Sequence, residues 1–164
     1  PQALAILKKY NAKATFFMVG KNVSANPDIA KQVRKEGHQI GNHTWDHPQL
    51  PKLSLDNAKK EILDTQEAIQ KATGVQTKIT RPPYGAINNA IQYSVDQSFI
   101  MWDVDSLDWK THNTTAILNE VKKEVKPGSI ILMHDIHQTT IDALPTVLDY
   151  LKSQGYTLDR KSVV

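Results

Sequence analysis

Short apolar segments alternate with helix patterns from one end of this 164-residue sequence to the other. The predicted strands are residues 14–19, 39–42, 78–81, 99–104 and 129–133, and residues 156–158 begin a last one. Strands that alternate with helices favour a parallel sheet with right-handed crossovers, so the predicted fold class is α/β. The chain is short for eight such units, and we expect a distorted TIM-like barrel with fewer than eight strands. A doubly wound open sheet is the alternative.

Capping residues mark where the predicted helices begin and end. Asn26 before Pro27 is typical of a helix start, and Gly37 of a helix end. Ser54 begins a long helix that Gly74 ends. The side of that helix that we expect to be buried carries Ala58, Ile62, Thr65, Ile69 and Ala72. Further helices are expected up to Lys9, over residues 89–96, from Asn113 or Thr114 to Val125, and over about 144–153.

Composition narrows the chemistry that the chain can perform. It contains no cysteine, so disulfides and thiolate ligands are excluded and any metal must be held by His, Asp or Glu. The net charge of +3 is spread over helical faces without a stripe suited to nucleic acid. No apolar run approaches the roughly 18 residues of a membrane span. We therefore expect neither nucleic acid nor a membrane to contact this segment.

The unusual residues of the chain gather just after predicted strands. They fall in four stretches, residues 43–47, 81–85, 105–109 and 134–135. In parallel α/β folds the active site lies at the carboxyl ends of the strands. These four stretches are therefore the candidate site.

His43 and His47 have the spacing of a metal-binding pair. On a helical turn both imidazoles would face the same way and could share one Zn²⁺; the alternative is two surface histidines on a loop. A catalytic zinc needs a third protein ligand. The aspartates that could supply it are Asp46, Asp103, Asp105, Asp108 and Asp135.

Three other features could contribute to a catalytic site, as an oxyanion-binding turn, a general acid and the wall of a pocket. The two prolines between Arg81 and Tyr84 stiffen a turn whose N–H groups could bind an oxyanion, or which is simply a structural loop. His134 ends an apolar strand as a rim residue or a general acid, and Asp108 could orient it and raise its pKa. Trp109 could wall an apolar pocket or pack in the core.

Together the four motifs resemble the polysaccharide deacetylase (NodB homology) domain, carbohydrate esterase family four. The resemblance runs from about Gln2 to Leu158 and is strongest to the peptidoglycan N-acetylglucosamine deacetylases of Gram-positive bacteria. Residues 41–48, 100–110 and 131–137 carry that finer match. It implies a single catalytic domain over residues 1–158, followed by an atypical tail over 159–164.

The resemblance implies a role for each matching residue of the first two motifs. His43 and His47 are metal ligands, and the ion is Zn²⁺, with Co²⁺ or another divalent ion possible. Arg81 orients the catalytic base. The backbone N–H of Tyr84 helps to bind the oxyanion.

The same resemblance implies that the last two motifs supply the acid and the acetyl pocket. Asp108 supports His134, which protonates the leaving sugar nitrogen after a metal-activated water attacks the acetamide. Trp109 and Leu132 line the pocket for the acetyl methyl group. The products are a free amine and acetate.

One family motif has no counterpart in this sequence. It is Thr-Phe-Asp-Asp-Gly on the family's first strand, and it supplies the general base and the third metal ligand. A helix comes first here, so we expect a missing strand before Pro1 and an N-terminally truncated domain. This chain by itself is then expected to be inactive.

The implied function is removal of N-acetyl groups from N-acetylglucosamine in peptidoglycan by a monomeric protein outside the cell or on its surface. Chitin, chitooligosaccharide or acetylxylan are alternative substrates. Two other classes of function remain open, a catalytically silent glycan-binding relative and a metal phosphohydrolase. A phosphohydrolase would need more cationic groups around the site, and the Trp109–Leu132 pocket suits a methyl group better.

Overall fold

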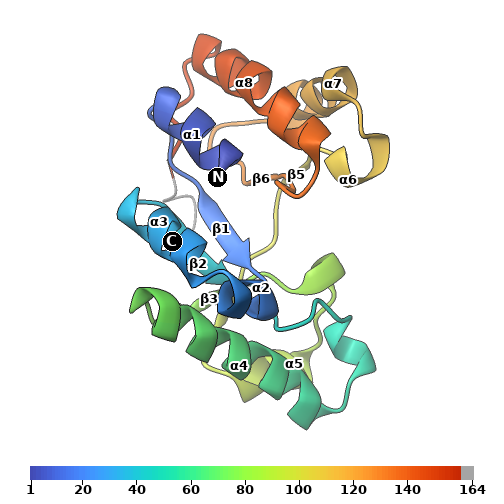
Figure 1. Ribbon diagram of the computed structural model, residues 1–164. Coiled ribbons are helices and arrows are strands. Elements are labelled where there is room, and N and C mark those ends of the chain that lie inside the picture. Colours follow the sequence, from blue (N-terminus) through green and yellow to red (C-terminus); the bar gives the residue numbers. More distant parts are fainter. Residues whose placement is uncertain (160–164) are drawn as a thin grey trace. The chain divides into compact units, whose positions relative to one another are not determined.

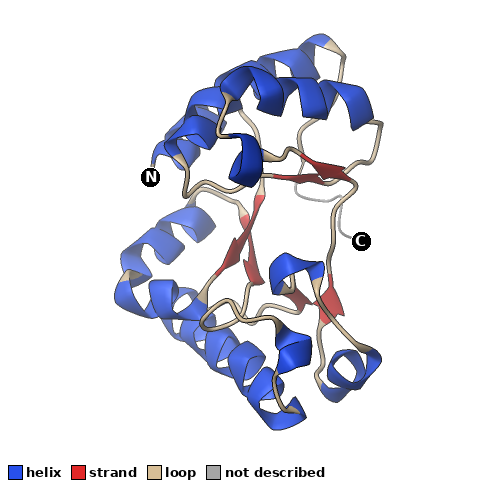
Figure 2. Ribbon diagram, turned by 90° about the vertical axis from the view of Figure 1, so that its right-hand side faces the viewer, coloured by secondary structure: helices blue, strands red, loops and turns tan. Residues whose placement is uncertain are grey.

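The computed structural model describes residues 1–159 and separates them into two compact units. Unit 2 is continuous and runs from Thr15 to Met101. Unit 1 combines Pro1–Ala14 with the segment that starts at Trp102. Both units contain helices and parallel strands, which confirms the α/β class (Figure 2).

Unit 2 is built on four parallel strands in the order β1-β2-β3-β4. The strands are β1 (Thr15–Met18), β2 (Gln39–Asn42), β3 (Ile79–Thr80) and β4 (Ser98–Phe99). Its helices are α2 (Gly20–Ala25), α3 (Pro27–Lys35), α4 (Leu55–Thr73) and α5 (Asn89–Ser94), with short 3₁₀ turns η1 (Leu50–Lys52) and η2 (Pro83–Gly85). The long helix α4 packs against β2, α2, α3 and α5 (Figure 1). Helix α4 is therefore the central helix of this unit.

Helix α4 has the boundaries that its capping residues predict. The Ser54 hydroxyl accepts a hydrogen bond from the Asn57 N–H, and Gly74 ends the helix with a left-handed φ of 71°. The predicted buried side is confirmed for Ala58, Ile62, Thr65 and Ile69, whereas Ala72 is only half-buried. Within the core, Ala58 and Ile62 form a buried cluster with Leu50 and Ile91.

Helix α2 is an element that the sequence did not predict. It begins at Gly20, where an added Cβ would lie 2.4 Å from Thr65 Oγ1 and 3.0 Å from Thr65 Cα. Glycine is therefore required here because α2 and α4 approach each other closely. The propensity of this short segment is weak, and its contact with α4 holds it in helical form.

Unit 1 contains one pair of parallel strands, β5 (Val104–Asp105) and β6 (Ile131–Leu132). Its helices are α1 (Gln2–Lys9), α6 (Asp108–Thr111), α7 (Thr114–Glu124) and α8 (Gln138–Ser153). Helix α7 packs against α8 and β5, and α1 packs against α8 (Figure 1). The buried cluster of this unit comprises Val104, Ile117, Val121, Ala143, Val147 and Leu151.

The single strand predicted over residues 99–104 is wrong. Ile100 N–H still donates to the Thr80 carbonyl, next to β4, but Asp103 and Val104 donate to the carbonyl of Ile130. The chain changes its bonding partner between these positions, so two short strands form. An apolar run in the sequence does not show that change.

Two predictions near the end of the chain are also corrected. Helix α8 begins at Gln138 rather than near 144 and runs through Pro145, because burial of Thr140, Ile141 and Ala143 stabilises its first turns. The predicted strand over residues 156–158 does not form. Its backbone groups bond elsewhere, with Tyr156 N–H donating to Leu151 and the Leu158 carbonyl accepting from Lys13.

Two remaining predictions concern the tail and the membrane. The tail predicted over 159–164 lies, apart from Asp159, outside the described residues. Among residues 1–159, the structure contains no helix with the length and hydropathy needed to cross a bilayer.

Candidate functional site

The structure gathers the eight predicted site residues into two groups, one in each unit. His43, His47, Arg81 and Tyr84 lie together in unit 2. Asp108, Trp109, Leu132 and His134 belong to unit 1, where Leu132 lies on β6 and the other three lie after β5 or β6.

The imidazoles of His43 and His47 are neighbours, although the segment that carries them is not helical. Their ring centroids are 4.8 Å apart with an interplanar angle of 70°. Thr44 and His47 adopt left-handed φ values of 66° and 61°, so the segment is an irregular loop. The expected helical turn is therefore wrong, but the loop brings the two rings together all the same.

Two side chains that the sequence did not single out hold this loop in place. Asn42 is fully buried at the end of β2, and its Oδ1 accepts from the Thr44 N–H at 2.9 Å. On α4, Glu61 Oε2 accepts from the N–H groups of Trp45 at 2.8 Å and Asp46 at 2.9 Å. Three successive backbone donors between the histidines are thus bonded to two anchored side chains.

The start of α2 binds the same loop from its carbonyl side. Gly20 N–H donates to the Thr44 carbonyl at 2.9 Å, and Lys21 N–H donates to the Trp45 carbonyl at 3.2 Å. The Lys21 ammonium also forms an ion pair with Asp46. The loop is therefore fixed at both its donors and its acceptors.

The donor chemistry of this histidine pair fits a divalent metal ion. His43 Nδ1 lies 2.6 Å from the Arg81 carbonyl oxygen, a contact that requires the proton on Nδ1. In that tautomer Nε2 is the atom that carries the ring's lone pair, as in metal-bound histidines whose other nitrogen donates to a carbonyl. Two imidazoles are fewer than the three protein ligands of a catalytic zinc. Within residues 1–159, no three His, Asp or Glu side chains are grouped to hold a metal ion.

Arg81 is buried, and its guanidinium donates to two backbone carbonyls of the segment that follows β4. Its Nε donates to the Ile100 carbonyl at 3.2 Å and an Nη to the Met101 carbonyl at 2.9 Å. The guanidinium also lies 4.2 Å from the centre of the Phe17 ring. Burial lowers the pKa of Arg81 to about 10, which leaves it a cation at neutral pH. The residue thus braces the turn that follows β3.

Tyr84 sits at the tip of that turn in a left-handed conformation with a φ of 61°. Its exposed ring packs edge-to-face on His47, with centroids 4.9 Å apart. The bonds that close the turn are donated by the N–H groups of Gly85 and Ala86. This geometry is the strained, stiff turn that the two prolines predict.

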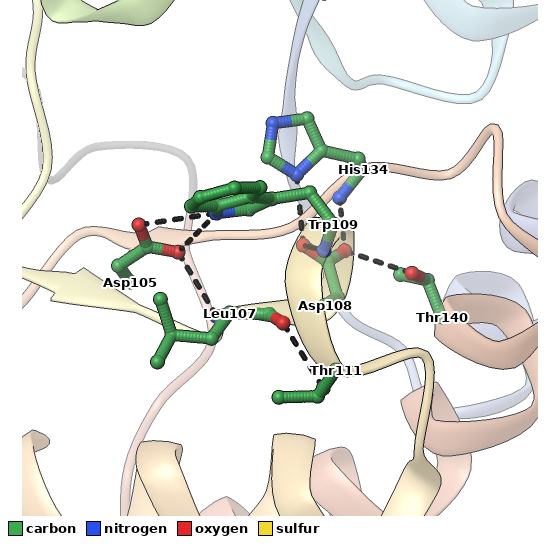
Figure 3. Close-up of polar contacts among 7 residues, drawn as sticks. All are labelled: Asp105, Leu107, Asp108, Trp109, Thr111, His134 and Thr140. Carbon is green, nitrogen blue, oxygen red and sulfur yellow. Dashed lines mark hydrogen bonds and ion pairs between the residues drawn. The ribbon is translucent and has the colours of Figure 1, made fainter.

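Asp108 and His134 form a dyad in unit 1 (Figure 3). The fully buried Asp108 begins α6, and its Oδ1 lies 2.8 Å from His134 Nδ1. Its Oδ2 accepts from the His134 backbone N–H at 2.5 Å and from the Thr140 hydroxyl at 2.8 Å. The Trp109 N–H donates to Oδ1 as well. Both carboxylate oxygens are therefore satisfied, and His134 is held at its backbone and its ring.

The charge state of Asp108 follows from these bonds. Burial by itself raises the pKa of this carboxyl, but hydrogen bonds from the His134 ring, the His134 N–H and the Thr140 hydroxyl stabilise its anion. The net effect lowers the pKa of Asp108 below its ordinary value. A buried carboxylate that remains charged orients an imidazole through Nδ1 and leaves Nε2 for proton transfer.

Trp109 is half-exposed and tied to the same loop. Its Nε1 donates to both oxygens of Asp105 at 3.3 Å, and Asp105 Oδ1 also accepts from the Leu107 N–H (Figure 3). The latter bond supports the left-handed φ of 53° at Leu107. Leu132 is buried on β6. The two bonds from Trp109 Nε1 to the Asp105 carboxylate orient the indole ring.

Four of the aspartates considered as third metal ligands have partners of other kinds. Asp46 pairs with Lys21, Asp103 Oδ2 accepts from the Ile130 N–H, and Asp105 and Asp108 have the roles above. Asp135 is exposed.

Asn42, Glu61 and Thr140 are site residues that sequence reasoning missed. Glu61 and Thr140 lie on helices far along the chain from the groups they hold. Asn42 offered a weak signal, because a polar residue at the end of an apolar strand is unusual. No spacing rule connects the other two to their partners.

Comparison with known protein families and solved structures finds relatives of this chain. The family model described as polysaccharide deacetylase matches residues 1–98. The peptidoglycan-N-acetylglucosamine deacetylase PgdA of Listeria monocytogenes is 46% identical over 156 residues, which is 95% of this chain and 34% of that protein.

Two solved structures extend the comparison to three dimensions. The peptidoglycan deacetylase PdaC of Bacillus subtilis matches with a TM-score of 0.95 at 41% identity, covering 98% of this chain and 80% of that one. A CE4 family pseudoenzyme from Bacillus anthracis matches with a TM-score of 0.92 at 34% identity, covering 99% and 58%. The chain spans about a third of the length of the curated relatives PgdA and PdaC, each covered to 34%.

Proposed function

The chain belongs to the polysaccharide deacetylase family, and from this premise we propose that the protein carrying it removes N-acetyl groups from N-acetylglucosamine in peptidoglycan. The observation that carries the proposal is the 46% identity of the chain to a peptidoglycan-N-acetylglucosamine deacetylase. The geometry of the Asp108–His134 dyad, which suits proton transfer, supports it. Such a protein acts outside the cell or on its surface, where its polymer is found.

His43 and His47 are the residues of this chain that would hold a divalent ion, and Zn²⁺ is an ion for which imidazole is a common ligand. The bound ion would act as a Lewis acid that polarises the acetyl carbonyl and lowers the pKa of water. The chain contributes the orientation of both rings. It does so through the Arg81 carbonyl on His43 and through the Tyr84 ring on His47.

His134 is the proposed general acid. Its Nδ1 faces Asp108, so Nε2 is the atom that would deliver a proton to the leaving sugar nitrogen. The resemblance assigns the backbone N–H of Tyr84 to the oxyanion and the surfaces of Trp109 and Leu132 to the acetyl methyl group. Arg81 would orient the catalytic base of the family.

The finer architecture belongs to the same proposal. We infer a distorted barrel with fewer than eight strands, because the chain aligns over nearly its whole length with a solved peptidoglycan deacetylase. We also infer that the protein acts as a monomer.

Acetate release tests the proposed reaction. The protein that carries this chain is incubated with N-acetylglucosamine oligomers and with peptidoglycan, and His134→Ala is compared with Lys110→Ala, an exposed change on α6. We expect His134→Ala to lower kcat by about 100-fold or more with its metal content unchanged, the usual scale for loss of a general acid. Loss of the metal in His134→Ala would make His134 a ligand and contradict the assignment.

The choice of polymer is tested in the same assay. We expect acetate from N-acetylglucosamine polymers and little from acetylated xylan, because the chain resembles enzymes of the cell wall. Faster turnover of acetylxylan would overturn the substrate but leave the general-acid role of His134 standing.

A second candidate function is binding of a glycan without chemistry. The observation that favours this candidate is the structural match to a pseudoenzyme of the same family. It predicts retention of the protein on peptidoglycan with no acetate released at any metal concentration.

A further inference from the structure

Unit 1 contains a second pair of neighbouring histidines, separate in sequence from the pair discussed above. The ring centroids of His112 and His137 are 4.8 Å apart with an interplanar angle of 75°. The corresponding values for His43 and His47 are 4.8 Å and 70°. The chain therefore builds the same arrangement of two imidazoles twice.

Backbone hydrogen bonds tie this second pair to the segments that carry the dyad. His112 follows α6, and its N–H donates to the carbonyl of Asp108 at 3.3 Å. His137 caps the start of α8, and its N–H donates to the carbonyl of His134 at 3.3 Å. Each histidine thus follows one member of the dyad along the chain.

The spacing of the rings suits a shared metal ion. Two imidazoles that bind one tetrahedral ion at about 2.1 Å from each nitrogen have ring centres roughly 5 Å apart. His112 is exposed and His137 is half-buried, so solvent can supply the remaining ligands. Imidazole is a preferred ligand of Zn²⁺, Ni²⁺ and Cu²⁺.

We propose that His112 and His137 form a second binding site for a late first-row divalent cation such as Zn²⁺ or Cu²⁺. A cation bound there links the end of α6 to the start of α8. Because these are the segments that present Asp108 and His134, occupancy stabilises the folded form of the region around the dyad. The inference does not depend on the deacetylase reaction.

Cu²⁺ is the probe for this site, because imidazole binds it most strongly among the divalent ions of the series. Titration calorimetry is performed on the protein that carries this chain, with His43→Ala and His47→Ala, which removes the other histidine pair. We expect one Cu²⁺ per chain and an increase in the melting temperature on binding. Adding either His112→Asn or His137→Asn should weaken the affinity at least tenfold and abolish the increase.

Asparagine is chosen because it suits both backbone positions. His112 has a φ of 44°, which asparagine tolerates, and asparagine is a favourable residue at a helix N-cap such as His137. The control is His134→Asn in the same background, which removes an imidazole from the dyad and should leave Cu²⁺ affinity unchanged. Circular dichroism establishes that each variant is folded.

Three results would overturn the proposal. The first is that no Cu²⁺ binds to the variant that lacks His43 and His47. The second is that His112→Asn leaves the Cu²⁺ affinity of that variant unchanged. The third is that His134→Asn lowers the Cu²⁺ affinity. None of them bears on acetate release, so failure here is distinguishable from failure of the proposed function.

Discussion

At the residue scale, Glu61 is a side chain that holds the loop between His43 and His47. One of its oxygens accepts from two successive N–H groups, those of Trp45 and Asp46. We expect Glu61→Ala to weaken Zn²⁺ binding by that histidine pair about 10-fold or more, the usual effect of losing a residue that orients ligands. Calorimetry on a chain that also carries His112→Asn and His137→Asn isolates the pair.

Two further variants show whether the effect is one of positioning. Glu61→Gln keeps an oxygen acceptor and should retain most of the affinity. Glu67→Ala changes an exposed carboxylate on the same helix and should retain all of it. If Glu67→Ala weakens Zn²⁺ binding as much as Glu61→Ala does, Glu61 acts by general electrostatic attraction. The proposal that it positions the loop through its hydrogen bonds would then be wrong.

Thr140 and Thr139 offer a matched pair of substitutions at the dyad. The Thr140 hydroxyl donates to Asp108, whereas the buried Thr139 hydroxyl has no partner among the described residues. We expect Thr140→Val to destabilise the chain by about 1.5–3 kcal/mol, the value of a hydrogen bond to a charged group. Thr139→Val should be neutral or stabilising. Urea unfolding at neutral pH measures both, and equal losses would exclude a special role for the Thr140 bond.

The stability difference between wild type and Thr140→Val should depend on pH in a defined direction. The folded pKa of Asp108 is depressed, so its anion stabilises the native state above the unfolded pKa of about 3.9. This stabilisation is lost as the pH falls through the lower folded pKa. The free-energy difference between the two proteins should therefore be full at neutral pH and shrink on acidification. A difference that stays constant in acid would mean that the bond does not depend on the charge of Asp108.

At the element scale, the contact between α2 and α4 decides the effect of substituting Gly20. Helix propensity alone predicts that Gly20→Ala stabilises the chain by up to about 1 kcal/mol. Packing predicts the opposite, because the new Cβ would lie 3.0 Å from the backbone of Thr65. We expect a net loss of about 1–3 kcal/mol in the free energy of unfolding, the usual cost of overpacking.

Ser24→Ala is the control for this helix, because Ser24 is an exposed position of α2 where only propensity acts. It should be neutral or slightly stabilising. A stabilised Gly20→Ala variant would show that α2 can shift away from α4 at little cost, and the close approach would then not be required.

At the scale of the whole molecule, the two compact units predict where destabilisation spreads. Gly20 lies in unit 2 and Thr140 in unit 1, and each unit has its own buried cluster. In hydrogen exchange we expect Gly20→Ala to increase exchange in β1–β4 and α4, and Thr140→Val in β5, β6, α7 and α8, because local openings follow cooperative units. An identical increase everywhere in both variants would mean that the chain opens as one unit.

Much of the fold was predictable because its signals are local. Ser54 and Gly74 mark the two ends of α4, and the spacing of Ala58, Ile62 and Ile69 marks its buried side. The apolar segments before His43 and His134 also predicted that these histidines follow strands, and they lie after β2 and β6. Capping and periodicity act over one or two helical turns, so they are visible in the sequence.

Tertiary structure alone decided the rest. The split of residues 99–104 into two strands depends on Thr80 and Ile130, and the form of the histidine loop depends on Glu61. Thr140 acquires its role because α8 begins early enough to place it against Asp108. These choices arise from hydrogen-bond partners and close contacts that are remote in sequence, and a linear pattern carries no record of which remote groups will meet.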